Sequence, residues 1–174
     1  MIVFDPHPGY QDYQNTDLTD HCFDSQKLDA FNFAGANLGD CKFNETVLTN
    51  CDLRRAKFTS STLMNCTFYN CQLKGAIFQL TNLTAATFSN LNLDGVDFTR
   101  AILLATRFNR VSLLGVKGLR YFGPLPDGRM IYAVDGNNMY AVGDFWGGYD
   151  AVQAYAQRGN MGINGVINAL GGEQ

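Results

Sequence analysis

The chain has few charged residues, few histidines and no long apolar run. Asp, Glu, Lys and Arg make up only 17% of its 174 residues, whereas hydrophobic residues make up 46%. This balance argues against an intrinsically disordered chain, which needs low hydrophobicity and high net charge. No stretch approaches the ~18 apolar residues of a transmembrane helix, and residues 1–10 lack the pattern of a signal peptide. We therefore expect neither a membrane protein nor a protein secreted by this route.

Residues suited to catalysis or metal binding are also scarce. The only histidines are His7 and His21, and neither stands in a motif with a cysteine or serine. The five cysteines include no close CxxC pair, the carboxylates form no evident catalytic pair, and no glycine-rich stretch precedes a Lys-Ser or Lys-Thr. We expect no enzyme activity and no catalytic, cofactor-binding or metal-binding residues. A ligand or base role for His21, and a disulfide or metal role for the cysteines, are the less favoured alternatives.

The chain does have a five-residue repeat. Every fifth residue from Leu18 to Leu113 is Leu or Phe, twenty positions in succession. On a helix, five residues advance by roughly 140°, so these side chains would scatter around the axis. On a flat strand, an odd step reverses the face at every repeat. The backbone must therefore turn a corner in each repeat and direct every fifth side chain into a common interior, as in a solenoid.

The position two residues before each Leu or Phe is mostly small. Four cysteines occupy it: Cys41, Cys51, Cys66 and Cys71. We expect these cysteines to pack as small apolar side chains, with Cys51 and Cys71 in one column. The bulky or polar exceptions, His21 among them, gather in the first coil, where we expect looser packing.

Segments such as Ala36-Asn37-Leu38, Cys51-Asp52-Leu53, Ala56-Lys57-Phe58 and Val96-Asp97-Phe98 resemble the Ala-Asp/Asn-Leu-X-X pattern of the pentapeptide-repeat family. The resemblance covers about residues 16 to 115. It implies an all-β fold, a right-handed, four-sided β-helix with four pentapeptides in each coil. Twenty pentapeptides then make about five coils, a rod of about 24 Å at the usual strand spacing.

Columns of residues spaced by twenty agree with four sides. Glycine recurs at Gly35, Gly75, Gly95 and Gly115, a column broken only by Arg55, and asparagine recurs at Asn50, Asn70 and Asn90. Both residues tolerate tight or left-handed corners, and stacked asparagines can form a hydrogen-bonded ladder. In the core we expect Phe58, Phe78 and Phe98 to face Phe68, Phe88 and Phe108, with a change of phase at Leu48–Leu53.

Three regions follow from this pattern: an N-terminal cap at 1–15, the repeat region at 16–115 and a C-terminal region at 116–174. In the last region, 130–134 and 139–142 predict a β-hairpin, and 150–158 and 163–170 predict short helices. The tail is rich in aromatic residues, which either cap the rod or form an interface with another protein or a second copy. The candidate interface residues are Tyr121, Phe122, Tyr140, Phe145, Trp146, Tyr149 and Tyr155.

The preferred function is a non-catalytic structural or protein–protein interaction module with an unidentified protein partner. Residues 140–149 are similar to C-terminal segments of some phage-encoded pentapeptide-repeat proteins, which implies a virion component or a phage accessory protein. The family resemblance also implies an alternative, a DNA mimic that binds gyrase and protects it from quinolones. Over residues 16 to 115, however, nine acids balance nine bases, and a neutral rod is a poor mimic.

The remaining expectations concern surroundings and partners. We expect no direct nucleic-acid binding, since the sequence shows no extended basic patch. We expect homo-oligomers, if they form, to do so through the C-terminal tail. The expected location is the cytoplasm of a bacterial or phage-infected cell, or the virion for a phage structural component.

Overall fold

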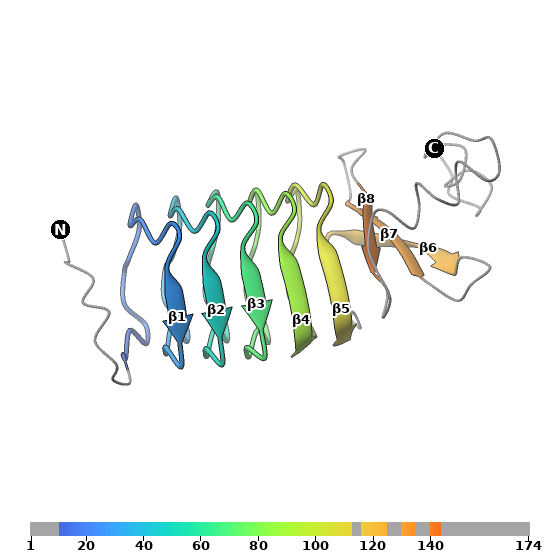
Figure 1. Ribbon diagram of the computed structural model, residues 1–174. Helices are drawn as coiled ribbons and strands as arrows, with labels where there is room; N and C mark the ends of the chain where they lie inside the picture. The colour runs from blue at the N-terminus through green and yellow to red at the C-terminus, as the bar shows by residue number, and fades with distance from the viewer. Residues whose placement is uncertain (1–10, 113–115, 125–129, 135–139, 144–174) are drawn as a thin grey trace.

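The computed structural model describes residues 11–112, 116–124, 130–134 and 140–143, and every element in these ranges is a strand (Figure 1). One side of a rod is formed by β1 (Lys27–Asp29), β2 (Val47–Thr49), β3 (Thr67–Tyr69), β4 (Thr87–Asn92) and β5 (Arg107–Ser112). These strands pair in parallel, each in register with residues twenty positions further along the chain. The twenty-residue coil is therefore confirmed, and β1 to β5 contribute one strand from each of five successive coils.

The other three sides consist of isolated parallel bridges in the same register. Examples are Asp12 with Asn32, Asp17 with Asn37, and Cys22 with Lys42. Each coil thus meets the next on four sides, which confirms the four-sided β-helix. The first bridge already includes Asp12, and the last joins Asp97 to Lys117.

Left-handed backbone makes the corners. Every fifth residue from Asn15 to Arg110 has a positive φ, between 51° and 72°, although only three of these residues are glycine. For a residue with a Cβ this conformation costs roughly 1–2 kcal/mol, so the ladder of bonds between coils must offset the cost. Among the asparagines, the Asn70 side-chain amide donates to Asn50 Oδ1 at 2.7 Å, and Asn90 donates to Asn70 at 3.4 Å. The predicted asparagine ladder is present, and Gly115 lies outside the described residues.

The repeated Leu and Phe residues fill the interior. All of those from Leu18 to Phe108 are at most 2% exposed. Phe58 stacks on Phe78 with ring centroids 4.7 Å apart, and Phe68 stacks on Phe88 at the same distance. The two columns meet edge to face across the rod, as between Phe68 and Phe78 at 5.8 Å. Both predicted aromatic columns are confirmed.

The aromatic columns change sides where the sequence changes phase. In the first coils Phe23 stacks on Phe43 at 4.3 Å and Tyr13 stacks on Phe33 at 5.6 Å. Phe43 then meets Phe58, the first ring of the later columns, at 5.6 Å with the ring planes 65° apart. The stacked rings therefore move from one pair of opposite sides to the other, with an edge-on contact at the junction.

The small inward position holds buried hydroxyl groups as well as cysteine and alanine. Four of these hydroxyl residues are at most 1% exposed, and each donates to the carbonyl oxygen 23 residues earlier at 2.6–2.9 Å. They are Thr46, Ser61, Thr81 and Thr106. Because a buried polar group is tolerated only when it is hydrogen-bonded, these bonds explain why the interior accepts them. In the first coil Thr16 and His21 are half-buried and Gln26 is exposed, as expected for looser packing there.

A three-stranded antiparallel unit continues the sheet after the last coil. It contains β6 (Leu119–Pro124), β7 (Met130–Val134) and β8 (Tyr140–Gly143), and β8 pairs in parallel with β5. The predicted hairpin is the β7–β8 pair, whereas β6 was not predicted. Since an open strand edge invites unwanted pairing, β8 gives β5 a partner within the chain. The two predicted helices lie outside the described residues.

Candidate interaction surface

The buried cysteines act as packing groups. The Sγ atoms of Cys41, Cys51 and Cys71 lie 3.0–3.4 Å from carbonyl oxygens 23 residues earlier, as the hydroxyls do. Burial raises the pKa of the Cys41 thiol to about 11, so this thiol stays protonated at neutral pH and is a poor nucleophile. Hydrogen bonding to Cys51, together with burial, raises the pKa of Cys71, and the close approach of these two sulfurs stays a prediction. Cys22 alone among the five is exposed.

His21 is half-buried at the small inward position of the first coil. Its Nδ1 lies 2.9 Å from the Leu18 carbonyl oxygen and 3.1 Å from that of Thr19, so Nδ1 carries the proton and donates. The ring also packs 6.4 Å from that of Phe23. These contacts give His21 a structural role at the end of the stack.

The Asp and Asn side chains at the second position of the repeat brace the corners. The Asp17 carboxylate accepts a hydrogen bond from the backbone N–H of Thr19, two residues ahead. The side chains of Asp52, Asp97 and Asn82 likewise each accept a bond from the backbone N–H two residues ahead. This is the local turn that Asp and Asn side chains favour, and it gives a physical reason for Asp or Asn at the second position of the repeat. Hydrogen bonds from the Thr19 side chain and backbone lower the pKa of Asp17. Throughout the described ranges, no three His, Cys, Asp or Glu side chains cluster as a metal site would.

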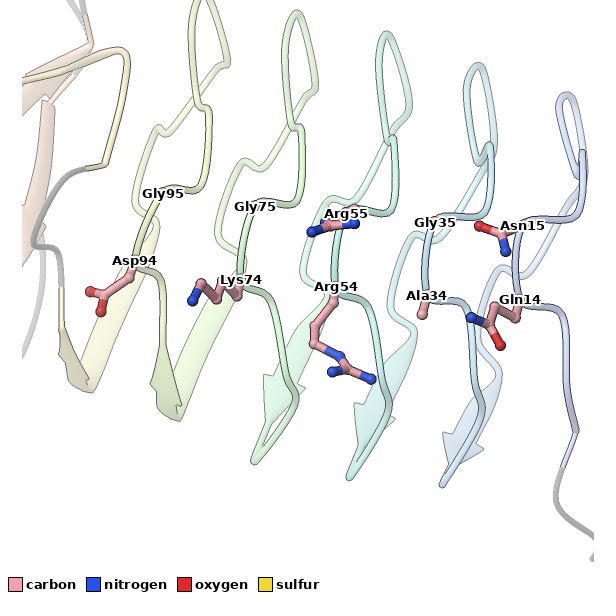
Figure 2. Close-up of a pocket in the computed structure, with 10 residues that line it drawn as sticks. All are labelled: Gln14, Asn15, Ala34, Gly35, Arg54, Arg55, Lys74, Gly75, Asp94 and Gly95. Atoms are coloured by element: carbon pink, nitrogen blue, oxygen red, sulfur yellow. The ribbon is translucent and has the colours of Figure 1, made fainter.

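A long groove that the sequence did not reveal lies along the described coils. It has a volume of about 560 Å³ and follows an edge of the rod across successive coils (Figure 2). Two rows of residues line it, one at the left-handed corner and one just before it. The corner row is Asn15, Gly35, Arg55, Gly75 and Gly95, and the preceding row is Gln14, Ala34, Arg54, Lys74 and Asp94.

The groove is basic near its middle. Arg54 is paired with Asp52 through its Nε at 2.9 Å and through Nη2, and hydrogen bonding to Arg54 lowers the pKa of Asp52. Arg55 and Lys74 are exposed, and neither forms an ion pair with a carboxylate in the described part of the chain. The backbone N–H of Arg55 donates to the Lys74 carbonyl at 3.1 Å, so these two cations stand on directly bonded coils. The middle of the groove therefore presents two exposed cations, Arg55 and Lys74, on coils that are hydrogen-bonded to each other.

Charge is segregated along the rod. Residues 11–45, here called the acidic block, contain seven acids and two bases, a net charge of −5. Residues 46–117, the basic block, contain three acids and eight bases, a net charge of +5. The two charges cancel when they are summed over the whole repeat region, so the net charge of that region does not show the segregation. Because salt screens charges over about 8 Å at physiological ionic strength, a partner near one block experiences mainly that block's field.

The structure places only part of the aromatic tail predicted from the sequence. Tyr121 and Phe122 belong to β6, and Tyr140 is the first residue of β8. These strands are neighbours of β7 in one sheet. Phe145, Trp146, Tyr149 and Tyr155 lie outside the described residues. A tail interface therefore stays a prediction.

Sequence comparison agrees with the geometry. A family model described as a pentapeptide repeat region matches residues 46–117, a span that begins where the basic block begins. Residues 46–117 are therefore a pentapeptide-repeat region. No curated protein matches it. In the described ranges, no helix combines the length and apolar character needed to cross a membrane.

Solved pentapeptide-repeat structures are similar to the chain at low identity. One is Rfr23 from the cyanobacterium Cyanothece 51142, with 18% identity, a TM-score of 0.49 and coverage of 59% of this chain and 80% of that one. A second is HetL from Nostoc sp. strain PCC 7120, described as involved in heterocyst differentiation regulation, with 18% identity, a TM-score of 0.41 and coverage of 61% and 56%. A third is QnrB1, described as a plasmid-mediated fluoroquinolone resistance protein, with 20% identity, a TM-score of 0.41 and coverage of 62% and 61%.

Proposed function

We propose that this protein is a non-catalytic interaction module, a rigid rod that binds a protein partner through the basic block. The observation that supports this proposal most strongly is the contrast between a filled interior and a charge-segregated exterior. Phe and Leu side chains fill the interior of the described coils. The outer surface, in contrast, carries five net positive charges on the basic block. Such a field steers and orients an acidic partner.

Rigidity supports the same role. The coils are joined by backbone hydrogen bonds on all four sides, such as Leu38 N to Lys57 O at 2.7 Å and Phe33 N to Asp52 O at 2.8 Å. A surface held in this way loses little conformational entropy when a partner binds. A preformed surface of this kind therefore favours binding of a partner whose surface is complementary to the rod.

The charge distribution argues against the alternative of DNA mimicry. A mimic of DNA has to present negative charge along its length, as the phosphates of the duplex do. Here the acidic block covers only residues 11–45, and the longer basic block would repel a site built for phosphates. A supercoiling assay with purified gyrase separates the two functions, since a mimic inhibits the reaction or protects it from a quinolone.

The proposal can be tested by affinity capture with matched charge-reversal variants. The full chain is used to capture proteins, with cross-linking, from extracts of the cell that produces it. The double variant Lys57→Glu/Lys74→Glu reverses two exposed charges of the basic block, and Lys27→Glu/Lys42→Glu reverses two exposed charges of the acidic block.

We expect the wild type and the Lys27/Lys42 variant to capture the same partner, and the Lys57/Lys74 variant to lose it. Capture should also weaken as salt rises. Equal capture by both variants would contradict a role for the basic block. No capture by the wild type above background would contradict the interaction module itself.

A further inference from the structure

We propose that the groove lined by Arg55 and Lys74 binds an extended acidic segment of the partner protein, with carboxylates of that segment on these two cations. This inference rests on the proposed function and names the site and the chemistry that would recognise the partner.

Glycine keeps the groove open on the C-terminal side of Arg55. A Cβ built on Gly95 would meet nothing within 4 Å, and one on Gly75 would lie 3.6 Å from Arg55 Cγ. On the other side of Arg55, the Asn15 side chain already covers Gly35. A ligand backbone can therefore approach the rod over Gly75 and Gly95 while its side chains reach the two cations (Figure 2).

Arg55 occupies a backbone position that suits glycine better. Its φ is 58°, and three of the other four residues in its column are glycine. An arginine here costs the fold roughly 1 kcal/mol relative to glycine, because the left-handed conformation crowds its Cβ. Arg55 also has no carboxylate partner among the described residues to offset that cost. A ligand that binds the guanidinium gives this costly residue a role.

The charges around the groove favour carboxylates on a peptide over a phosphate backbone. Arg54 is already neutralised by Asp52, and Asp94 stands at one end of the groove. A nucleic-acid strand carries a phosphate at every nucleotide, so its charges follow one another along the whole groove. A peptide can place acidic side chains opposite Arg55 and Lys74 and neutral side chains elsewhere along the groove.

The dimensions fit a short extended segment. The lining residues come from five successive coils, so at about 4.8 Å per coil the groove spans about 19 Å. An extended chain rises about 3.3 Å per residue, so about six residues would cover it. Arginine binds carboxylates through two parallel N–H bonds, which would fix the position of one acidic side chain of the segment.

The test is fluorescence anisotropy of a labelled hexaglutamate peptide titrated with the full-length protein. Three single variants are compared with the wild type: Arg55→Gly, Lys74→Gln and, as the matched control, Lys27→Gln on an exposed site of β1. Arg55→Gly removes a cation and gives the corner its preferred residue, so it should fold at least as well as the wild type. Circular dichroism and thermal unfolding check this.

We expect Arg55→Gly and Lys74→Gln each to weaken peptide binding by about two- to fivefold, as for exposed ion pairs, and Lys27→Gln to leave it unchanged. A six-nucleotide single strand and inorganic pyrophosphate should compete poorly. Equal weakening by Lys27→Gln, or equal competition by the nucleotide strand, would show general anion attraction and overturn the proposal. No peptide binding by the wild type would also overturn it, but would leave the partner capture described above standing if that capture succeeds.

Discussion

The acidic block and the basic block share one backbone and differ in both core and surface. In the acidic block the stacked rings are Tyr13–Phe33 and Phe23–Phe43, on one pair of opposite sides. In the basic block the stacked columns begin at Phe58 and Phe68, on the other pair. The net charge changes from −5 to +5 close to the same point. The repeat thus fixes which positions point inward, and leaves both the placement of the rings and the surface charge free to vary.

The largest effect should come from removing an aromatic ring of the basic block. Phe78 contacts four other rings, Phe58, Phe68, Phe88 and Phe98, at 4.7–5.9 Å. Phe78→Ala should reduce the free energy of unfolding by about 3–5 kcal/mol through lost burial and the cavity that remains. Denaturant unfolding followed by circular dichroism measures this change.

The matched substitution in the acidic block is Phe43→Ala. Phe43 has only two ring contacts, with Phe23 and Phe58. Since an aromatic pair is worth about 0.5–1.5 kcal/mol beyond burial, Phe43→Ala should cost less than Phe78→Ala by about 1–3 kcal/mol. Equal costs would mean that the rearranged rings of the two blocks are energetically equivalent.

The next effect is on stability at alkaline pH. The Cys41 thiol has a folded pKa of about 11, compared with 9.0 normally, because burial disfavours the thiolate. Between these values the unfolded chain binds fewer protons than the folded one, so stability falls as pH rises from 9 to 11. The shift corresponds to about 2–3 kcal/mol. Urea midpoints measured across this range should fall less for Cys41→Ala than for the wild type, and parallel curves would contradict the assignment.

Glycine corners in the two blocks should differ in their tolerance of a side chain. Gly95→Ala in the basic block should cost about 1–2 kcal/mol from its φ of +71° alone, since nothing lies within 4 Å of the new Cβ. Gly35→Ala in the acidic block has a similar φ of +68° and also places Cβ 2.3 Å from Asn15 Oδ1. The Asn15 side chain must then move, so Gly35→Ala should cost more. Thermal unfolding of the two variants gives the comparison, and a smaller cost at Gly35 would be inconsistent with this geometry.

A smaller effect is expected at the junction of the blocks. Ser61 Oγ donates to the Leu38 carbonyl at 2.6 Å and accepts from the Cys41 N–H at 3.1 Å, so it joins the basic block to the acidic one. Ser61→Ala should cost about 1–2 kcal/mol, because a buried donor loses its acceptor. Thr81 Oγ1 donates to the Phe58 carbonyl at 2.7 Å, lies 3.3 Å from that of Gln79, and accepts no backbone N–H in the described coils. Thr81→Val should therefore cost less than Ser61→Ala in the same unfolding assay.

The interior was predictable from the sequence because it depends on a strict period. Leu18 to Phe108 could be assigned to the core one by one, and the Asn50–Asn70 ladder followed from a spacing of twenty. The hydrogen bonds from Ser61 and Thr81 were not predicted, because the sequence pattern showed only that the position two residues before each Leu or Phe is small. Nor was the β5–β8 pairing, because a parallel partner more than thirty residues away leaves no periodic signal.

The surface was less predictable, for a different physical reason. The open part of the groove depends on Gly75 and Gly95, which leave space beside Arg55. In a sequence, a glycine at a corner predicts a left-handed backbone and does not by itself predict a groove. The opposite charges of the two blocks are visible in the sequence, but they cancel when the repeat region is treated as one unit. Screening over about 8 Å is the reason to count each block separately.

The central claim, that the basic block carries the binding surface, is tested most directly by lysine footprinting of the captured complex. Exposed lysines serve as reporters in both blocks, with Lys27 and Lys42 in the acidic block and Lys57, Lys74 and Lys117 in the basic one. Acetylation of each lysine is measured by mass spectrometry with and without the partner. The account predicts protection of Lys74 and Lys57 and unchanged labelling of Lys27 and Lys42. Protection of Lys27 and Lys42 with Lys57 and Lys74 still fully labelled would contradict it.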